Sequence, residues 1–414
     1  MKFLWKVDNI DERQLLAWAN SFPYCCFLNP NHWQNQYPQG SFPKLLAVAH
    51  QKFTYSFIDE QNFTGKWLFG YLGYDLKNRL ENLQSKNPAY IKFPESLCFE
   101  PLHLFVWEND CINVFTETSE KELFAEIQNF TSPHFQEQIG EIRSKVSFEQ
   151  YCQNVEAIKN HIIEGDIYEL NYCIEFVAEN ICLNPIERYL YLCQLSPMPF
   201  SALLKVENKY VLCASPERFL KKTGQTLISQ PIKGTIRRGN SPEEDQTNYQ
   251  ILRNSEKEIA ENMMIVDLVR NDLARSAVVG STRVAEFFGI YPFRQVFQMI
   301  STIEAELSPN VSPQKAIANA FPMGSMTGAP KIRAMELIDR YENSRRGVFS
   351  GAIGYFSPQG DFDFNVVIRS LFYDASKQKL SFQVGSAITY DAQAETEYQE
   401  CLLKAQAIRQ VLAL

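Results

Sequence analysis

The sequence contains few histidines, and all of them lie in its first 161 residues. The five histidines occupy positions 32, 50, 103, 134 and 161. A catalytic triad or a zinc site that depends on histidine is therefore excluded for residues 162–414. Acid–base or metal chemistry in that part of the chain must use carboxylates, lysine, tyrosine or backbone groups.

The cysteines lack the spacing of a zinc ribbon. None of the ten cysteines forms a C-x-x-C pair with another, and such pairs are the signature of that class of metal site. Most stand among apolar neighbours, as Cys193 and Cys213 do. We therefore expect buried, reduced thiols, which suit the reducing cytoplasm.

Long apolar runs and an excess of basic residues are also missing. No stretch reaches the ~20 apolar residues of a membrane helix, and the N-terminus has no apolar run typical of a signal peptide. We expect a cytoplasmic protein without a membrane partner. The net charge of −8 argues against nucleic acid as a partner, although a few local cations can still attract a small anion into one cleft.

The length of 414 residues indicates two or three domains, or one large domain with an appendage. Residues 1–135 are rich in aromatic residues, and short alternating runs at 45–49 and 102–107 predict strands. The charged segment 119–142 is compatible with a helix and is expected to link two parts of the chain.

The texture of the sequence changes at Ser147. Helical periodicity predicts helices at 148–164, 255–275, 331–341 and 395–412, the first of them ending at Gly165. Apolar runs predict strands at 200–206, 210–214, 347–356, 365–373 and 380–384. Because helices and hairpin-like strands do not alternate regularly, the fold class is predicted to be α+β with antiparallel sheets.

The segment Pro231-Ile232-Lys233-Gly234-Thr235 places a lysine between an apolar residue and a glycine. Burial would lower the pKa of Lys233 and leave a neutral amine that can attack carbon. Gly234 would allow a ligand to approach the backbone closely. Taken alone, such a segment is more often an exposed lysine beside a turn.

Two pairs of glutamates recur at i, i+3 spacing, Glu258 with Glu261 and Glu397 with Glu400. Two helices that each offer carboxylates suit Mg²⁺, which prefers oxygen ligands. Two alternatives remain open. Ser255-x-x-Glu258 is also a capping box, and Glu400 with Lys404 is an i, i+4 pair that a solvated helix would show anyway.

Three further features carry weaker signals. The small-residue loop 324–331 leads into a predicted helix and could present backbone N–H groups to an anion, or be a tight turn. Arg369, inside the predicted strand Val366–Ser370, needs a carboxylate partner, either internal or on a substrate. Glu217 could act as a general acid if its pKa is raised, or form a surface pair with Arg218.

Together and in this order, these features resemble the chorismate-utilising enzyme family. The matching segments cover about residues 145–412. They are S-P-E-R-F at 215–219, P-I-K-G-T at 231–235, E-I-A-E-N-M-M-I-V-D-L-V-R-N-D at 258–272, G-S-M-T-G-A-P-K at 324–331, R-R-G-V-F-S-G-A-I-G-Y at 345–355, N-V-V-I-R at 365–369 and E-T-E-Y-Q-E-C-L-L-K-A at 395–405.

The resemblance implies a fold of two large antiparallel β-sheets packed face to face, with helices outside and the substrate cleft between the sheets. Residues 1–135 would be the variable N-terminal part that contributes to this β-sandwich, and residues 145–412 the chorismate-binding catalytic core.

The resemblance also implies a reaction. Lys233 favours the para-aminating branch of the family, because ortho-aminating members usually carry P-I-A-G-T. In that branch the lysine attacks C2 of chorismate while the C4 hydroxyl leaves. Ammonia then enters at C4 and expels the lysine, which gives 4-amino-4-deoxychorismate for folate and para-aminobenzoate synthesis. An ortho-aminating enzyme and a non-catalytic chorismate-binding subunit are the alternatives.

The roles of the other residues follow from the same resemblance. Glu217 would be the general acid for the departing hydroxyl. Glu261 and Glu400 would bind Mg²⁺, with Glu258 and Glu397 close by. The expected substrate contacts are Gly234, Thr235 and Lys404 at the ring carboxylate, Arg369, Gly385 and Ala387 at the enolpyruvyl carboxylate, and Thr327 near the ring.

Some positions depart from the family pattern. Phe349 stands where many members have tyrosine, and Gln298 where a histidine is common. Glu169 replaces the usual glutamine, and it could pair with Lys233 or help to deprotonate it. The family's tryptophan-binding signature is not recognisable around Cys25–Pro30. Because no glutamine-hydrolysing cysteine site is apparent, the resemblance implies a separate glutamine amidotransferase subunit as the source of ammonia.

Overall fold

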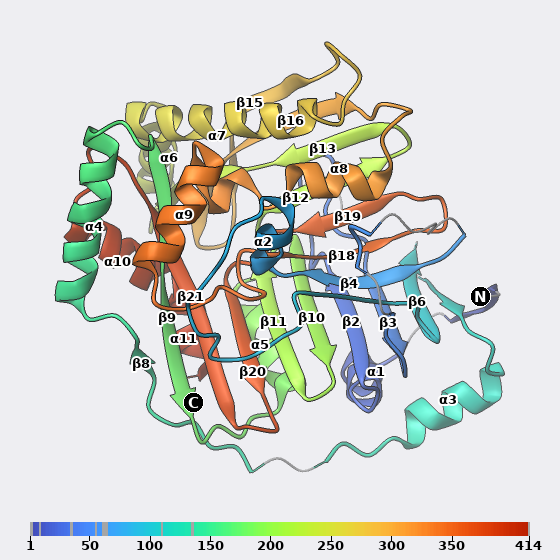
Figure 1. Ribbon diagram of the computed structural model, residues 1–414. Coiled ribbons are helices and arrows are strands. Elements are labelled where there is room, and N and C mark those ends of the chain that lie inside the picture. The colour runs from blue at the N-terminus through green and yellow to red at the C-terminus, as the bar shows by residue number, and fades with distance from the viewer. Residues whose placement is uncertain are drawn as a thin grey trace.

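The computed structural model describes residues 3–7, 10–33, 36–53, 56–59, 65–108, 111–133 and 136–412. These residues form two large antiparallel β-sheets with helices around them (Figure 1). One sheet has 12 strands and the other nine. The predicted α+β class with two antiparallel sheets is confirmed.

The 12-stranded sheet combines strands from the whole length of the chain. Its central strands are buried along almost their entire length, because the other sheet covers one face and helices cover much of the other. In spatial order the strands are β1 (Phe3–Val7), β7 (Cys111–Phe115), β6 (His103–Glu108), β3 (Leu45–Ala49), β2 (Tyr24–Asn29), β10 (Phe200–Val206), β11 (Lys209–Ser215), β20 (Ser370–Asp374), β21 (Lys379–Ile388), β9 (Glu169–Glu179) and β17 (Gly328–Ala329), with β8 (Arg143–Ser144) beside β9.

The nine-stranded sheet ends at a more exposed edge. β15, next to β16, alternates between exposed and half-buried positions over much of its length, which is the pattern of a strand with one solvated face. The spatial order is β14 (Ile232–Arg237), β16 (Val296–Glu306), β13 (Thr226–Gln230), β12 (Arg218–Thr223), β19 (Phe362–Asn365), β18 (Ala352–Phe356), β4 (Leu68–Leu72) and β5 (Ser96–Phe99), with β15 (Arg283–Pro292) paired to β16.

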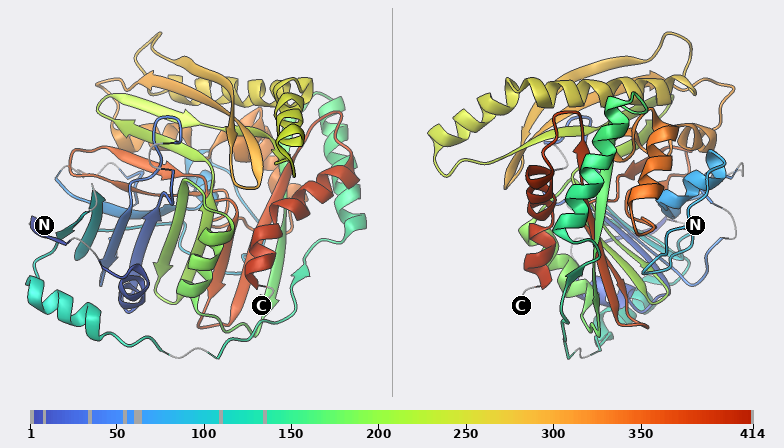
Figure 2. Two further views of the ribbon diagram at one scale, coloured as in Figure 1. Left: turned by 180° about the vertical axis from the view of Figure 1, so that it is seen from behind. Right: turned by 60° about the vertical axis from the view of Figure 1, so that its left-hand side comes forward.

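The helices lie on the outer faces of the sheets (Figure 2). Those that pack against the 12-stranded sheet or its neighbouring helices are α1 (Glu12–Ala19), α4 (Phe148–Ile163), α5 (Pro185–Leu195), α9 (Lys331–Tyr341), α10 (Ala394–Lys404) and α11 (Gln406–Leu412). Those beside the nine-stranded sheet are α6 (Pro242–Arg253), α7 (Glu256–Ala274) and α8 (Pro313–Ala320). The others are α2 (Lys77–Leu80) and α3 (Glu120–Asn129).

Several predicted elements match the structure closely, and others differ. α9 and β10 have the predicted bounds, and α4 ends one residue early, at Ile163. The single helix predicted over 395–412 is wrong, because α10 and α11 are separated at Ala405. The charged segment 119–142 is helical only in α3.

The N-terminal residues are built into both sheets. β2 pairs with β10 in the larger sheet, and β4 pairs with β18 in the smaller one.

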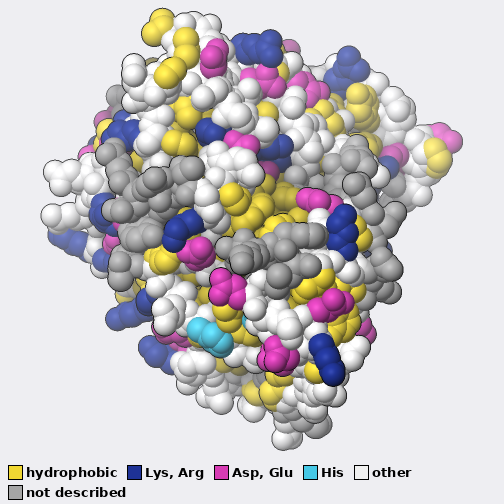
Figure 3. All heavy atoms as spheres, turned by 90° about the vertical axis from the view of Figure 1, so that its right-hand side faces the viewer, with side chains coloured by type: hydrophobic (Ala, Val, Ile, Leu, Met, Phe, Trp, Pro, Cys, Tyr) yellow, Lys and Arg dark blue, Asp and Glu magenta, His cyan; other side chains and the backbone are white. Residues whose placement is uncertain are grey.

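Seven of the ten cysteines are buried, as expected, and the other three are half-buried. Of the helices in the described ranges, none is both long and apolar enough to cross a membrane. On the face shown in Figure 3, basic and acidic side chains are interspersed.

Candidate functional site

Lys233 lies at the start of β14, where the edge of the smaller sheet approaches the larger one. Its side chain is buried, and its Nζ lies 3.5 Å from Oε1 of Glu169, the first residue of β9. Glu169 is only 1% exposed, and its Oε2 has no hydrogen-bond partner among the described residues. The ion pair therefore links the two sheets inside the protein. The sequence left two roles open for Glu169, pairing with Lys233 or deprotonating it, and the structure shows the pairing.

The charge of Lys233 differs from the sequence-based expectation. Burial acts to lower the pKa of Lys233, but the surrounding carboxylates outweigh it and the pKa is raised. The groups that raise it, in order of effect, are Glu169, Glu261, Glu217 and Glu400. The expected lowering of the Lys233 pKa is therefore wrong, because several negative charges converge on one cation.

Gly234 allows α7 to approach β14 closely. Its φ of +95° lies in the left-handed region, and a Cβ there would be 3.2 Å from both Glu258 Oε2 and Met299 Cβ. The Asn262 side-chain amide on α7 donates hydrogen bonds to the carbonyls of Lys233 and Met299. The glycine is thus required by packing between this helix and the strand that carries Lys233.

Glu217 lies between β11 and β12 and is 3% exposed. Burial raises the pKa of Glu217 to about 7, although hydrogen bonds from the Ser325 side chain and the Ile232 backbone and the charge of Lys233 act in the opposite direction. A carboxyl group with such a pKa can donate a proton near neutral pH. The alternative surface pair with Arg218 is wrong, because that side chain is buried and pairs with Asp363.

Four glutamates from α7 and α10 form what we call the acidic cluster: Glu258, Glu261, Glu397 and Glu400. Burial raises the pKa of Glu261 to about 7 and also raises the pKa values of Glu258 and Glu397. Burial acts in the same direction on Glu400, but the attraction and hydrogen bond of Lys404, 2.5 Å away, outweigh it and lower its pKa. The cluster therefore concentrates negative charge that internal cations only partly balance.

The donor atoms of the acidic cluster suit a divalent cation, and no three of its carboxylates, all of them among the described residues, have ligand oxygens within 4.8 Å of one another. Glu261 Oε1 is buried and has no hydrogen-bond partner among the described residues, and carboxylate oxygens are preferred ligands of Mg²⁺. The predicted capping role also holds, since the Ser255 hydroxyl accepts from the Glu258 backbone N–H. Capping uses only the backbone of Glu258, while its carboxylate faces Gly234, so the two roles are compatible.

Two cations lie on the side of the site expected to meet the substrate. Lys404 donates from its Nζ to the Gly385 carbonyl at 2.9 Å, and Gly385 and Ala387 occupy alternate, half-buried positions on β21. Arg369 was predicted to lie in a strand, and this is wrong. It lies in the connection between β19 and β20, with a φ of 53°. Within the described ranges its guanidinium has no ion-pair or hydrogen-bond partner, so the internal carboxylate considered from the sequence is not seen.

The loop 324–331 is more closed than a free anion site would be. Thr327 is fully buried, and its hydroxyl lies within hydrogen-bond distance of the carbonyls of Met323 and Gly324. Lys331, at the start of α9, pairs with Asp272 of α7 at 2.6 Å. Thr235, another expected substrate contact, is exposed on β14.

The two remaining departures from the family pattern are both buried. Gln298 on β16 lies opposite Thr235, and its Oε1 has no hydrogen-bond partner among the described residues. Phe349 is 2% exposed.

Sequence reasoning missed Asn262 and Lys257, a lysine whose ammonium lies between two members of the acidic cluster. The i, i+4 spacing of Lys257 and Glu261 was the available signal.

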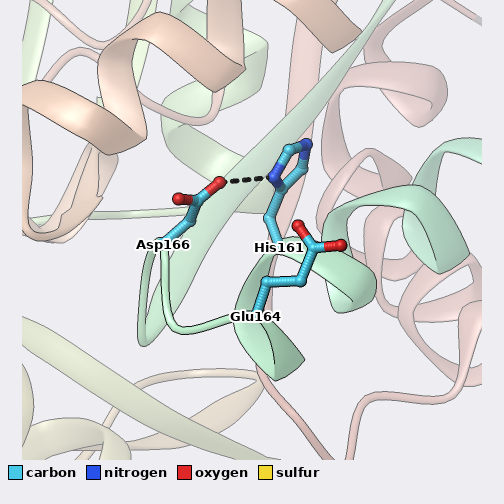
Figure 4. A group of neighbouring side chains, drawn as sticks. All are labelled: His161, Glu164 and Asp166. Carbon is cyan, nitrogen blue, oxygen red and sulfur yellow. Dashed lines mark hydrogen bonds and ion pairs between the residues drawn. The ribbon is translucent and has the colours of Figure 1, made fainter.

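A second group, His161, Glu164 and Asp166, brings potential metal ligands together at the end of α4 (Figure 4). Two of its three members already have partners: His161 Nδ1 lies 2.7 Å from Asp166 Oδ2, and Asp166 also pairs with Arg333. The other ring nitrogen of His161 is 3.0 Å from the Tyr341 hydroxyl. These contacts fix the turn that leads into Glu169, which is a structural role.

Comparison with known proteins places this geometry in one family. A family model described as chorismate binding enzyme matches residues 19–410. The chain is 32% identical over 362 residues to aminodeoxychorismate synthase component 1 of Bacillus subtilis, a match that covers 83% of this chain and 76% of the relative. It is also 32% identical over 365 residues to anthranilate synthase component 1 of Cereibacter sphaeroides, with 83% and 72% covered.

A solved structure shares the fold. The chain superposes on anthranilate synthase component I from Streptococcus pneumoniae with a TM-score of 0.74 and 25% identity, over 92% of this chain and 89% of that one. The two sheets and their surrounding helices are therefore a known arrangement, and the site lies where α7 and α10 meet β14 and β21.

Proposed function

Because the chain belongs to the family of chorismate binding enzymes, we propose that it acts as an aminodeoxychorismate synthase component 1, converting chorismate and ammonia to 4-amino-4-deoxychorismate and water. The observation that carries this proposal is the buried amine of Lys233, paired with Glu169 beside Glu217 and the acidic cluster. The name of the relative from Bacillus subtilis supports the same activity.

The proposed reaction has two displacements. The neutral amine of Lys233 forms a bond to C2 of chorismate, both ring double bonds shift (C1=C2 to C1=C6, and C5=C6 to C4=C5), and the C4–O bond breaks. Glu217 donates a proton to the departing hydroxyl, which leaves as water. Ammonia then bonds to C4, both double bonds shift back, and the C2–N bond breaks to release the lysine amine.

Lys233 must lose a proton before it can attack. Its raised pKa favours the ammonium form. Glu169, 3.5 Å from the Nζ, is the nearest candidate to receive that proton, and its buried position keeps competing water away. When the amine is expelled, the same carboxylate can return the proton.

The substrate carboxylates require cationic partners. Lys404, held between Glu400 and the Gly385 carbonyl, and Arg369, whose guanidinium is available, are proposed for the ring and enolpyruvyl carboxylates respectively. Glu261 and Glu400, with Glu258 and Glu397 beside them, would hold Mg²⁺. A bound Mg²⁺ would supply positive charge for the ring carboxylate in a cluster that is otherwise strongly acidic.

We further propose that ammonia comes from a separate glutamine amidotransferase subunit. The relatives from Bacillus subtilis and Cereibacter sphaeroides are both named as component 1 of their synthases. Gel filtration of the chain mixed with the cognate amidotransferase should give a heterodimer. Independent elution at micromolar concentrations of both would contradict this part of the proposal.

The test of the activity is product identification. Purified protein, chorismate, ammonium and Mg²⁺ should yield 4-amino-4-deoxychorismate by mass spectrometry. Lys233→Ala should reduce turnover at least 100-fold, because the nucleophile is lost. Unchanged turnover in that variant would overturn the covalent mechanism.

Anthranilate synthase is the second candidate, since a relative with that name is equally similar, at 32% identity over a similar length. It would form the fluorescent product anthranilate from the same substrates. Anthranilate appearing without any added lyase would favour this alternative. Chorismate binding without turnover, at all ammonia and Mg²⁺ concentrations, would instead indicate a non-catalytic subunit.

A further inference from the structure

Lys257 lies in the first turn of α7, directly before Glu258. Its Nζ is 3.4 Å from Glu397 Oε1 and 3.8 Å from Glu261 Oε1. These two oxygens come from different helices, so the ammonium bridges α7 and α10. Its position is where the two halves of the acidic cluster meet.

Lys257 and a bound divalent cation would compete for the same oxygens. Glu261 Oε1 is buried and has no hydrogen-bond partner among the described residues, and the ammonium of Lys257 forms an ion pair with it. Lys233 also acts on the charge of Glu261. A Mg²⁺ ion bound to Glu261 Oε1 would lie about 2 Å from it. A dication and an ammonium so close together would repel each other strongly.

We propose that Lys257 is a displaceable cation: it neutralises the acidic cluster when no metal is bound, and it must leave the cluster when a divalent cation binds. This inference rests on the metal site of the proposed function. It adds that Lys257 sets the affinity of that site, because each metal ion that binds must first break the contacts of Lys257.

The surroundings of Lys257 allow such a movement. Its side chain is 48% exposed, and a lysine side chain is a flexible four-carbon stem. Lys404, the other lysine beside the cluster, is held by both Glu400 and the Gly385 carbonyl and is less exposed. Lys257 can therefore turn into solvent, whereas Lys404 is fixed in place.

The test uses Lys257→Met in the full chain, with Mn²⁺ as the probe. After treatment with chelator, electron paramagnetic resonance of free Mn²⁺ gives the dissociation constant without substrate. The variant should bind Mn²⁺ roughly tenfold more tightly, because no ammonium has to be displaced. Its melting temperature in chelator should fall by about 2 °C, since the carboxylates then repel each other uncompensated, and saturating Mn²⁺ should restore it.

Arg270→Met is the matched control. Arg270 is exposed on the same helix and pairs with Asp267, about 20 Å along the axis from Lys257. This control removes the same charge from the same helix and should change neither the Mn²⁺ affinity nor the melting temperature in chelator.

Other results would overturn the inference in distinguishable ways. Mn²⁺ binding by Lys257→Met that equals or is weaker than wild type, while Glu261→Gln abolishes binding, would overturn the role of Lys257 and keep the metal site. No Mn²⁺ binding by either wild type or Lys257→Met would overturn both. A product other than 4-amino-4-deoxychorismate would overturn the proposed reaction and leave this inference standing.

Discussion

Carboxylates from four different parts of the chain determine the charge of Lys233. Glu169 has the largest effect among them, and it is also the only one that forms an ion pair with Lys233. The pKa of an amine is raised by nearby negative charge and lowered by burial. Replacing this one carboxylate should therefore shift the balance toward the effect of burial.

Glu169→Gln should lower the pKa of Lys233. The measurement is the pH dependence of Lys233 modification by trinitrobenzenesulfonate, followed by peptide mass spectrometry, because only the neutral amine reacts. The half-maximal pH should fall by about one unit or more. Glu175→Gln, which removes another carboxylate from β9, is the control. An unchanged half-maximal pH in Glu169→Gln would show that the other carboxylates suffice.

Glu217 should give the reaction an alkaline limit near pH 7. Its pKa is raised to about 7 by burial, so the protonated form that can act as an acid is present below that pH and is lost above it. Turnover with saturating ammonium should fall as the pH rises through 7. Glu217→Gln should turn over substrate much more slowly, and its remaining turnover should no longer fall as the pH rises through 7. If the fall persists in this variant, another group sets the alkaline limit.

At the residue scale, the sequence predicted which candidate side chains lie together better than it predicted their protonation states. Lys233, Glu217 and the acidic cluster could be singled out because each stands in a short motif and the motifs follow the order found in the family. The charge of Lys233 could not be predicted, because residues from β9, α7, α10 and the turn after β11 determine it. The same reason hid Lys257, which becomes notable only when α7 and α10 lie side by side.

At the scale of elements, one buried arginine connects a strand, a loop and the end of a helix. Arg346 donates to the carbonyls of Asn171 on β9 and Met326 in the 324–330 segment, and it pairs with Glu342 at 2.6 Å. Glu342 in turn accepts from the Cys173 backbone N–H. This network holds the start of β9, and with it Glu169, against the loop that contains Thr327.

Arg346→Met should destabilise the protein by about 3–5 kcal/mol, because it leaves Glu342 as an uncompensated buried charge. The free energy of unfolding in urea is the measurement. Arg333→Met removes a half-buried arginine on the protein surface that pairs with Asp166 and Glu336, and it should cost less than about 1 kcal/mol. Equal losses in the two variants would contradict the importance assigned to burial.

Helices with clear caps were the most predictable elements. Ser147 and Ser255 each accept a hydrogen bond in the first turn of their helix. The first helix begins where predicted, and the second begins one residue later. The hairpin of β15 and β16 was missed, because half-exposed β15 has neither a continuous apolar run nor strict alternation. The break between α10 and α11 was missed as well, since Ala405 is itself a good helix former.

For the molecule as a whole, local patterns predicted the α+β class but not the arrangement of the strands. β2 lies between β3 and β10, and β4 lies between β5 and β18. The pairs β2–β10 and β4–β18 each join strands that are more than 150 residues apart in the sequence. Periodicity carries no information on such distant pairs. The two-sheet arrangement could be predicted only through resemblance to the family.

These long-range pairings mean that residues 145–412 should not fold alone, although they contain every residue of the proposed site. Without the N-terminal part, β10 and β18 lose β2 and β4 and become long apolar edges, which tend to associate with other chains. The isolated fragment should aggregate or bind a hydrophobic dye without a cooperative thermal transition. Co-expression with residues 1–144 as a second chain should restore the transition, because the missing strands are then available. A monodisperse fragment that unfolds cooperatively would instead show that the larger part of the chain is an independent folding unit.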